Sequence, residues 1–327
     1  MIPRYSVVIT AHNAAGSIGD SLRSLARQEG IAPGDLEVVL VDDRSTDGTL
    51  DAARAAGLDC LRAIRIDKAT SSDLTTRQQA LARAFAEARA DIVLTLDADG
   101  IAVPDWVRHM AAPIEKGRAD AVAGGVSFRA KKGWIGLWQT VDQTVYLSIC
   151  RILSALGFAS GVLFGSFAFR RELFAKVGGW EQIGHTLTED LAFARALKRS
   201  GAQIAYDARP DMEVEACASW GVLIERAKRV SAGGVSALSI AIGGWMALLI
   251  VAAIAAAIFG GAATTALAVR YGLGVAHALF ALVRAGQWRL APLAFLYEPL
   301  AIGIGALVAV RLMRGSSVEW GGNRYER

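Results

Sequence analysis

In this 327-residue chain, two aspartates at the end of an apolar run have types and a spacing that could do chemistry. The run "DIVLTLDADG", residues 91–100, ends with Asp97 and Asp99. Side chains two residues apart in a strand point to the same face, so the two carboxylates would lie side by side. That arrangement is costly unless a cation or a donor-rich ligand lies between them. The alternative is a solvated turn, because Asp-Gly is a common turn pair.

A second acidic pair, Asp42 and Asp43, ends another strand-like run, "VVLVDDRSTDGT". Apolar runs at 5–10, 36–43, 91–100 and 120–128 alternate with stretches of helical periodicity. This alternation predicts an α/β fold, Rossmann-like, with a mostly parallel sheet covered on both faces. Ligands of such sheets bind at the carboxyl ends of the strands. We therefore expect both acidic pairs at one rim of the sheet.

Several common functions lack their sequence patterns. The twelfth position of an EF-hand loop counted from Asp43 is Arg54, and counted from Asp97 it is Arg108, so calcium loops are excluded. Neither a P-loop nor Gly-x-Gly-x-x-Gly occurs. The net charge of +4 comes without a basic tract interleaved with aromatics, which argues against a nucleic-acid partner. Cys60, Cys150 and Cys217 form no disulfide or zinc pattern and are typical of reduced thiols facing the cytosol.

Hydropathy divides the chain into regions. No charged side chain occurs from Ser231 to Val269, whereas about 20 apolar residues suffice to cross a bilayer. The amino terminus, "MIPRYSVVIT", lacks the long apolar core of a signal peptide. We expect a cytosolic catalytic domain over 1–230, a transmembrane region of two or three helices over 231–314, and a short basic tail over 315–327.

Five blocks in the chain, taken together, resemble a known enzyme family. They are "SVVITAHNAAGSIGDSLRSLARQ", "VVLVDDRSTDGT", "LTLDADG", "GSFAFRRELFAKVGGW" and "LTEDLAFARALKRSG". In this order they resemble family 2 glycosyltransferases with the GT-A fold, over roughly residues 4–230. The resemblance implies an inverting transferase that uses a nucleotide-sugar donor, a UDP-sugar foremost, and a divalent cation.

The resemblance also implies roles for individual residues. Asp97 and Asp99 would hold Mn²⁺ or Mg²⁺ on the donor diphosphate, because hard cations prefer oxygen ligands and relieve the repulsion between the carboxylates. Arg77 would lie near the donor; a solvated helix residue is the alternative. The nucleotide base and ribose would contact the residues that end the first two strands: Thr10, Ala11, His12, Asn13, Asp42 and Asp43.

The block "LTEDLAFARAL" resembles the segment that carries the family's general base. Asp190 would deprotonate the acceptor hydroxyl, with Glu189 as the competing base. Thr188 followed by acidic residues is also a good helix amino terminus. Both roles are compatible, with Thr188 capping the helix while Asp190 acts on the acceptor.

Two further motifs resemble membrane-bound members of the family. "IERAKRV" places Arg226 and Arg229 at the spacing of their R/Q-x-x-R-W motif, although Val230 replaces the tryptophan. The tail "VEWGGNRYER" has a Trp-x-x-x-Arg-Tyr spacing. This spacing resembles the one that follows the last membrane segment in ceramide glucosyltransferases and their bacterial relatives. Arg226, Arg229 and Arg324 would then face the donor diphosphate. The alternative is the positive-inside rule, which by itself places basic residues beside membrane spans.

The membrane region leaves its topology open. Apolar stretches fall near 235–258, 262–283 and 290–311. Arg270 and His277 are costly in lipid, so we expect the middle stretch to be re-entrant or tilted, leaving two crossings. Glu298 would pair with Arg270 or Arg284. The amphipathic stretch 134–158 is either an interfacial helix or a core helix of the catalytic domain.

The sequence therefore favours a multi-pass enzyme of the cytoplasmic (inner) membrane, with its catalytic domain in the cytosol. It would glycosylate a hydroxyl of a membrane lipid, such as ceramide, diacylglycerol, a hopanoid or a carotenoid. A processive polysaccharide synthase is the second hypothesis, although few spans are available for a polymer channel. A catalytically inactive membrane scaffold with this fold is the third, and the intact carboxylates argue against it.

Overall fold

The computed structural model describes residues 2–68, 73–129, 133–158, 161–232, 237–314, 318–320 and 323–325. The side chains of Arg229, of 232, 237 and 238, and of 314 onward lie outside that description. By its contacts the chain forms two compact units. The first comprises Met1–Ser127 and Gly161–Glu215, and the second comprises Phe128–Ser160 and Ala216–Arg327.

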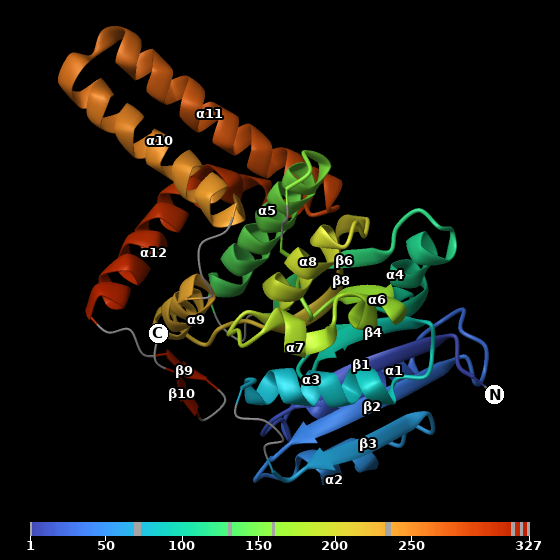
Figure 1. Cartoon of the computed structure of the whole chain (residues 1–327). Helices are drawn as coiled ribbons and strands as arrows, with labels where there is room; N and C mark the ends of the chain where they lie inside the picture. Colours follow the sequence, from blue (N-terminus) through green and yellow to red (C-terminus); the bar gives the residue numbers. More distant parts are fainter. Residues whose placement is uncertain are drawn as a thin grey trace. The chain divides into compact units, whose positions relative to one another are not determined.

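An eight-stranded sheet forms the centre of the first unit, in the order β3-β2-β1-β4-β7-β6-β8-β5 (Figure 1). Strands β3, β2, β1 and β4 are parallel to one another. β7 is antiparallel to both β4 and β6, and β5 is antiparallel to β8. The sheet is thus mostly parallel on the side that carries both acidic pairs. The strands are β1 Tyr5–Ala11, β2 Leu36–Asp43, β3 Leu61–Ile66, β4 Ile92–Asp97, β5 Ile101–Ala102, β6 Ala121–Arg129, β7 Phe167–Arg170 and β8 Ile204–Glu215.

The register of the parallel strands brings their carboxyl ends together. Ala11 at the end of β1 pairs with Asp42 of β2, and Thr10 pairs with Asp97 of β4. The chain therefore enters its loops after β1, β2 and β4 at one rim of the sheet. The prediction that the two acidic pairs share a rim is confirmed by this register.

Helices cover both faces of the sheet because its strands are apolar on both sides. α3 packs with α7 and α8 on the face presented by Val8, Val39, Val41 and Val93, around an aromatic cluster that includes Phe85. The alternate residues of the strands are equally buried, and α4 contacts β4, β7 and β8. The helices are α1 Ile18–Ala26, α2 Thr49–Ala55, α3 Thr76–Glu87, α4 Trp106–Glu115, α6 Glu172–Lys176, α7 Gly179–Ile183 and α8 Glu189–Arg199.

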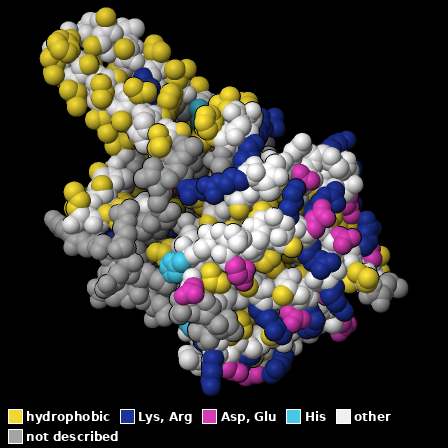
Figure 2. All heavy atoms as spheres, in the orientation of Figure 1, with side chains coloured by type: hydrophobic (Ala, Val, Ile, Leu, Met, Phe, Trp, Pro, Cys, Tyr) yellow, Lys and Arg dark blue, Asp and Glu magenta, His cyan; other side chains and the backbone are white. Residues whose placement is uncertain are grey.

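The second unit is helical and largely apolar. Three of its segments are long and apolar enough to cross a membrane: Ser239–Phe259, Gly261–Arg284 and Trp288–Met313. Hydrophobic side chains cover the outer surfaces of α10 and α11 (Figure 2). The elements are α5 Ile135–Ala155, α9 Trp220–Ala232, α10 Ala237–Phe259, α11 Gly261–Arg284, the 3₁₀ helix η1 Trp288–Leu293, α12 Ala294–Arg314, and the short strands β9 Val318–Trp320 and β10 Asn323–Tyr325.

The middle apolar stretch is a single uninterrupted helix, α11, rather than a re-entrant hairpin. Its Arg270 is buried, and the Nη1 atom lies 3.1 Å from both carboxylate oxygens of Glu298 in α12. The guanidinium also stacks on Trp245 of α10, 3.6 Å from the ring centroid. This pairing removes the reason for expecting a break in the helix, and it joins α10, α11 and α12 through one polar cluster.

The amphipathic helix α5 belongs to the second unit. Val141 and Val145 pack against Val275 and Leu282 of α11 and against Tyr297 of α12. It is therefore a core helix of the apolar unit and not of the sheet-containing one. On the same helix, burial raises the pKa of Asp142 to about 6, while the hydroxyl of Tyr297 donates a hydrogen bond to it.

Candidate active site

The carboxyl ends of β1, β2 and β4 carry the polar residues of the candidate site. At the end of β4, Asp97 is partly exposed and its Oδ1 atom accepts a hydrogen bond of 2.7 Å from Arg77 Nη2. The Nε atom of Arg77 lies 2.6 Å from Glu189 Oε1 in an ion pair. One guanidinium thus joins the Asp-x-Asp segment to the start of α8, and Arg77 is not the solvated helix residue that the sequence allowed.

The charges around Arg77 keep it protonated. Burial of the guanidinium opposes its charge, but Asp97, Glu189 and Asp190 outweigh this effect and raise the pKa of Arg77 well above its usual range. The Glu189 side chain is 8% exposed, so the guanidinium of Arg77 stabilises its buried negative charge.

Asp42 and Asp43 end β2 in a buried environment. Asp42 is completely buried, its Oδ2 atom lies 3.2 Å from Arg65 Nη1, and its Oδ1 atom has no hydrogen-bond partner among the described residues. A buried carboxylate oxygen without a donor is costly, so an N–H or O–H group from water or a ligand would be favourable there. Asp43 pairs with Arg44, although burial is the larger influence and raises the pKa of Asp43.

The loops after β1 and β2 are tied to each other. His12 Nδ1 donates a hydrogen bond of 2.6 Å to the backbone oxygen of Asp43, and the side chain of Asn13 accepts one of 2.8 Å from the Thr46 amide. Asn13 and Arg44 both adopt positive φ angles, 51° and 55°. Such conformations are uncommon for residues other than glycine and persist where the surroundings enforce them, often at ligand sites. The two loops therefore form one preorganised edge beside Thr10 and Ala11.

The residues present suit a divalent cation held together with a ligand. Asp97 and Asp99 supply hard oxygen donors at the exposed end of β4. No group of three or more His, Cys, Asp and Glu side chains forms a metal cage within the described part of the chain. A cation here would therefore complete its coordination with oxygens from water or from a bound phosphate.

The predicted capping of α8 by the Thr188 side chain is not seen in the structure. Thr188 occupies the amino-terminal cap position, but its side chain makes no capping hydrogen bond, because its backbone angles (φ −130°, ψ 70°) are not those of a capping residue. Gln78 of α3 supports the turn before α8 instead, donating to the backbone oxygen of Gly184 at 2.8 Å and accepting from the Thr186 amide at 3.2 Å. Asp190 is partly exposed, and its Oδ1 atom accepts from the Leu191 amide at 2.8 Å.

The basic residues expected at the diphosphate belong to the second unit. Arg226 is an exposed residue of α9, with its guanidinium 5.4 Å from the ring centroid of Phe128. Arg229 lies in the same helix and Arg324 in β10, and both side chains fall outside the described residues. Their role toward the donor stays a prediction.

Three supporting residues were not among those predicted: Arg65, Gln78 and Gly165. Thr75 and Gln78 form a capping box at the start of α3, and the spacing Thr-x-x-Gln is visible in the sequence. Arg65 and Gly165 leave no comparable signal. A Cβ on Gly165 would lie 2.9 Å from Asp97 Oδ2, so this glycine makes room for the carboxylate.

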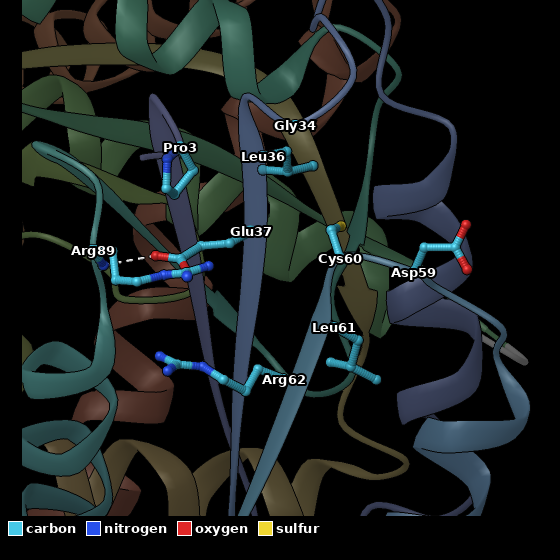
Figure 3. A pocket seen from close by; sticks show the side chains of 9 residues that line it. All are labelled: Pro3, Gly34, Leu36, Glu37, Asp59, Cys60, Leu61, Arg62 and Arg89. Carbon is cyan, nitrogen blue, oxygen red and sulfur yellow. Dashed lines mark hydrogen bonds and ion pairs between the residues drawn. The ribbon is translucent and has the colours of Figure 1, made fainter. Parts of the chain in front are cut away.

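A hollow of about 350 Å³ elsewhere in the first unit lies at the opposite ends of the strands (Figure 3). Its lining includes Leu36 and Leu61, which begin β2 and β3. Of its two carboxylates, Glu37 and Asp59, the first already binds Arg89 at 2.7 Å. The hollow is therefore separate from the rim that carries the acidic pairs.

The curled, mostly parallel sheet with an acidic rim and covering helices is a GT-A-like fold. The chain belongs to glycosyl transferase family 2, whose family model matches residues 6–178. This family consists of enzymes that use nucleotide-sugar donors. No curated protein sequence matches the chain significantly.

Comparison with solved structures finds one of similar fold and further matches with lower structural similarity, all at low sequence identity. A mannosyltransferase from Pyrobaculum calidifontis, in complex with GDP-Man and Mn²⁺, is 20% identical, covers 91% of this chain and 88% of its own, and has a TM-score of 0.57. S. aureus TarS 1-349 is 15% identical over 99% and 96% of the two chains, with a TM-score of 0.49. M. tuberculosis glucosyl-3-phosphoglycerate synthase is 22% identical over 66% and 72%, with a TM-score of 0.44.

Proposed function

We propose that the chain is an inverting, metal-dependent hexosyltransferase that moves a sugar from a nucleotide-sugar donor to a hydroxyl of a membrane lipid. The observation that carries the proposal is the shared rim. Asp42 offers a buried oxygen without a donor, and Asp97 lies beside Arg77 and Glu189 at the end of the next strand but one. A nucleotide over β1 and β2 would place its diphosphate toward β4.

Each group of residues at the rim would have its own role in the reaction. Asp42 and Asp43, with the segment Thr10 to Asn13, bind the nucleoside through its hydrogen-bond donors. Asp190 accepts the proton of the acceptor hydroxyl while that oxygen attacks the anomeric carbon from the face opposite the diphosphate. The bond from the anomeric carbon to the diphosphate breaks, and its electron pair leaves with the nucleoside diphosphate. Mn²⁺ or Mg²⁺ held by Asp97 and Asp99 would supply positive charge to the departing diphosphate.

The lipid acceptor is inferred from the second unit. Three helices that could span a membrane follow the sheet-containing unit in the same chain. A soluble acceptor needs no such anchor, whereas a lipid hydroxyl is confined to the bilayer surface. Because nucleotide sugars are cytosolic, we place the first unit in the cytosol and the helices in the cytoplasmic membrane, as a multi-pass protein. Arg226 and Arg229 stay part of the proposal as ligands of the donor diphosphate.

Donor binding is the direct test of this function. The full-length protein in detergent would be titrated calorimetrically with UDP- and GDP-sugars in the presence of Mn²⁺ and again with excess EDTA. Both nucleotides belong in the test, since the Pyrobaculum structure contains GDP-Man. We expect binding that EDTA abolishes and that Asp97→Asn weakens. Asp91→Asn is the matched control, because Asp91 is an exposed aspartate just before the opposite end of the same strand.

The acceptor needs a separate test. Lipid extracts of a strain lacking the gene would be compared with those of the parent by mass spectrometry. Loss of a lipid carrying one hexose would support the proposal. Loss of a polymer instead would identify a processive synthase, and absence of any nucleotide binding by the purified protein would indicate a scaffold.

A further inference from the structure

Arg77 contacts two carboxylates of the rim that come from different elements. Its Nη2 atom lies 2.7 Å from Asp97 Oδ1, and its Nε atom lies 2.6 Å from Glu189 Oε1. The Arg77 side chain is 26% exposed and the Glu189 side chain 8%, so solvent screens the pair with Glu189 only weakly. The Nη2 atom donates a hydrogen bond to Asp97, whereas the Nε contact with Glu189 meets the distance of an ion pair without the geometry of a hydrogen bond.

The residue next to Arg77 reinforces the same connection. Gln78 is completely buried, and it holds the backbone of the segment before α8 through Gly184 and Thr186. The capping box with Thr75 fixes Gln78 in turn. The first turn of α3 therefore holds the backbone of the segment that leads to Glu189 and Asp190. Arg77, in the same turn, connects the Glu189 side chain to Asp97.

Asp97 faces two competing demands. As a ligand of a divalent cation it must offer carboxylate oxygens to the metal, yet one of these oxygens already accepts a hydrogen bond from Arg77. A positive charge on the first neighbour of a metal ligand lowers the affinity for a cation through Coulomb repulsion. The same charge keeps Asp97 and Glu189 from repelling each other before the cation arrives.

We propose that Arg77 is a positioning residue with two roles. Its positive charge neutralises Asp97 while no divalent cation is bound, and its contact with Glu189 couples cation binding to the position of the Glu189–Asp190 turn. This inference rests on the proposed metal site. When a divalent cation binds Asp97, Arg77 keeps its ion pair with Glu189. This ion pair fixes the turn that carries the proposed base, Asp190. Arg77 therefore weakens metal binding while it orders the turn.

Two measurements on the full-length protein in detergent test the coupling without relying on turnover. Free Mn²⁺ would be quantified by electron paramagnetic resonance during titration with Mn²⁺, alone and with UDP or GDP. Backbone hydrogen exchange would be followed over residues 184–192. The variants are Arg77→Gln, Arg77→Lys and the control Arg83→Gln. Arg83 lies on the same helix in an exposed ion pair with Glu87.

The variants are expected to separate charge from geometry. Arg77→Gln should bind Mn²⁺ roughly tenfold more tightly, because a repelling charge is lost, and should exchange faster over 184–192. Arg77→Lys should keep the Mn²⁺ affinity of the wild type, since the charge remains, yet exchange faster, because an ammonium cannot bridge both carboxylates in the fork geometry. Arg83→Gln should change neither quantity.

The outcomes distinguish this inference from the proposed function. If the wild type binds Mn²⁺ and Arg77→Gln binds it with equal or lower affinity, the inference is wrong while the metal site stands. Unchanged exchange over 184–192 in both Arg77 variants would also overturn it. If the wild type binds no Mn²⁺ with or without nucleotide, the metal site and the inference fail together.

Discussion

At the scale of residues, the neighbours Glu189 and Asp190 have different surroundings. Glu189 is buried against Arg77, whereas Asp190 is partly exposed at the first turn of α8. A base must reach the acceptor, and a carboxylate committed to a guanidinium would have to break that ion pair first. The partial exposure of Asp190 therefore favours it over the buried Glu189 as the proposed base.

Asp190→Asn should lower turnover by about 10² to 10⁴, the usual loss when a general base is removed. Affinity for the nucleotide should remain, because other residues hold the donor. Glu189→Gln should cost less, acting through Arg77. Steady-state glycosylation and calorimetric donor binding would be measured for both variants. Normal turnover in Asp190→Asn together with loss in Glu189→Gln would assign the base to Glu189.

Gly165 provides a second prediction at this scale. A Cβ at this position would come within 2.9 Å of Asp97 Oδ2 and force the carboxylate to move. Gly165→Ala should therefore weaken Mn²⁺ binding roughly tenfold or more, since metal ligands tolerate little displacement. Gly303→Ala is the control, because nothing lies within 4 Å of its Cβ position. Equal Mn²⁺ affinity in the two variants would show that Asp97 does not need this space.

His109 adds a pH dependence away from the candidate site. A hydrogen bond to Asp207 is the main cause that raises the pKa of His109, with Asp211 adding to it, against burial and the nearby Arg209. A raised pKa in the folded state means that the stabilisation is fully present below the unfolded pKa of about 6.5 and is lost as pH rises through the folded value. His109→Gln should thus lower the melting temperature more at pH 5.5 than at pH 8.5. An equal loss at both pH values would contradict this assignment.

At the scale of elements, the apolar helices are joined by a buried polar cluster. Arg270 of α11 binds Glu298 of α12, and the indole of Trp245 in α10 donates to Glu298 at 2.6 Å. Gly274 leaves the space that the Glu298 carboxylate fills. A satisfied ion pair between apolar helices sets their register, because any slip would leave a charge unpaired.

Removing one partner of this pair should be more damaging than removing both. Glu298→Leu leaves Arg270 buried without a counter-ion, a loss of about 3–5 kcal/mol in comparable buried pairs. The double variant Arg270→Met with Glu298→Leu should recover much of that loss. Thermal unfolding in detergent would compare the wild type, Glu298→Leu, Arg270→Met alone and the double variant. If the double variant is as unstable as the two single losses added together, the pair does not act as a unit.

At the scale of the whole molecule, the chain combines an α/β unit with an apolar helical unit. The outward faces of α10, α11 and α12 carry many exposed large hydrophobic residues, among them Ile258, Phe259 and Val269. Exposed apolar surface of this extent is not stable in water. We therefore expect lipid to cover these helices.

Membrane residence can be checked on the full chain. After expression, the protein should sediment with membranes, resist extraction by alkaline carbonate and enter solution with detergent. A peripheral protein bound through charges would be released by carbonate. Recovery of a monodisperse protein without detergent would refute the assignment of the three helices as membrane spans.

The sequence by itself determined three strands of the parallel half-sheet, β1, β2 and β4, as well as the apolar helices and the positions of the acidic pairs. These features follow from hydrophobic periodicity and from the residues that end each run, which are properties of short segments. The rim followed as well, because parallel strands that end in Asp42 and Asp97 must end on the same side of their sheet. The pairing of Glu298 with Arg270 was one of two options that the scarcity of charges left open.

Only the tertiary structure decided which side chains meet. Arg77 lies 20 residues from Asp97 in the sequence and much farther from Glu189, and Asp42 meets Arg65 across neighbouring strands. Such contacts depend on which elements pack together and which rotamers fit there, and no local period encodes either. The same reason explains why α5 joined the apolar helices, why α11 needed no break and why Gln78, rather than the Thr188 side chain, supports the turn before α8.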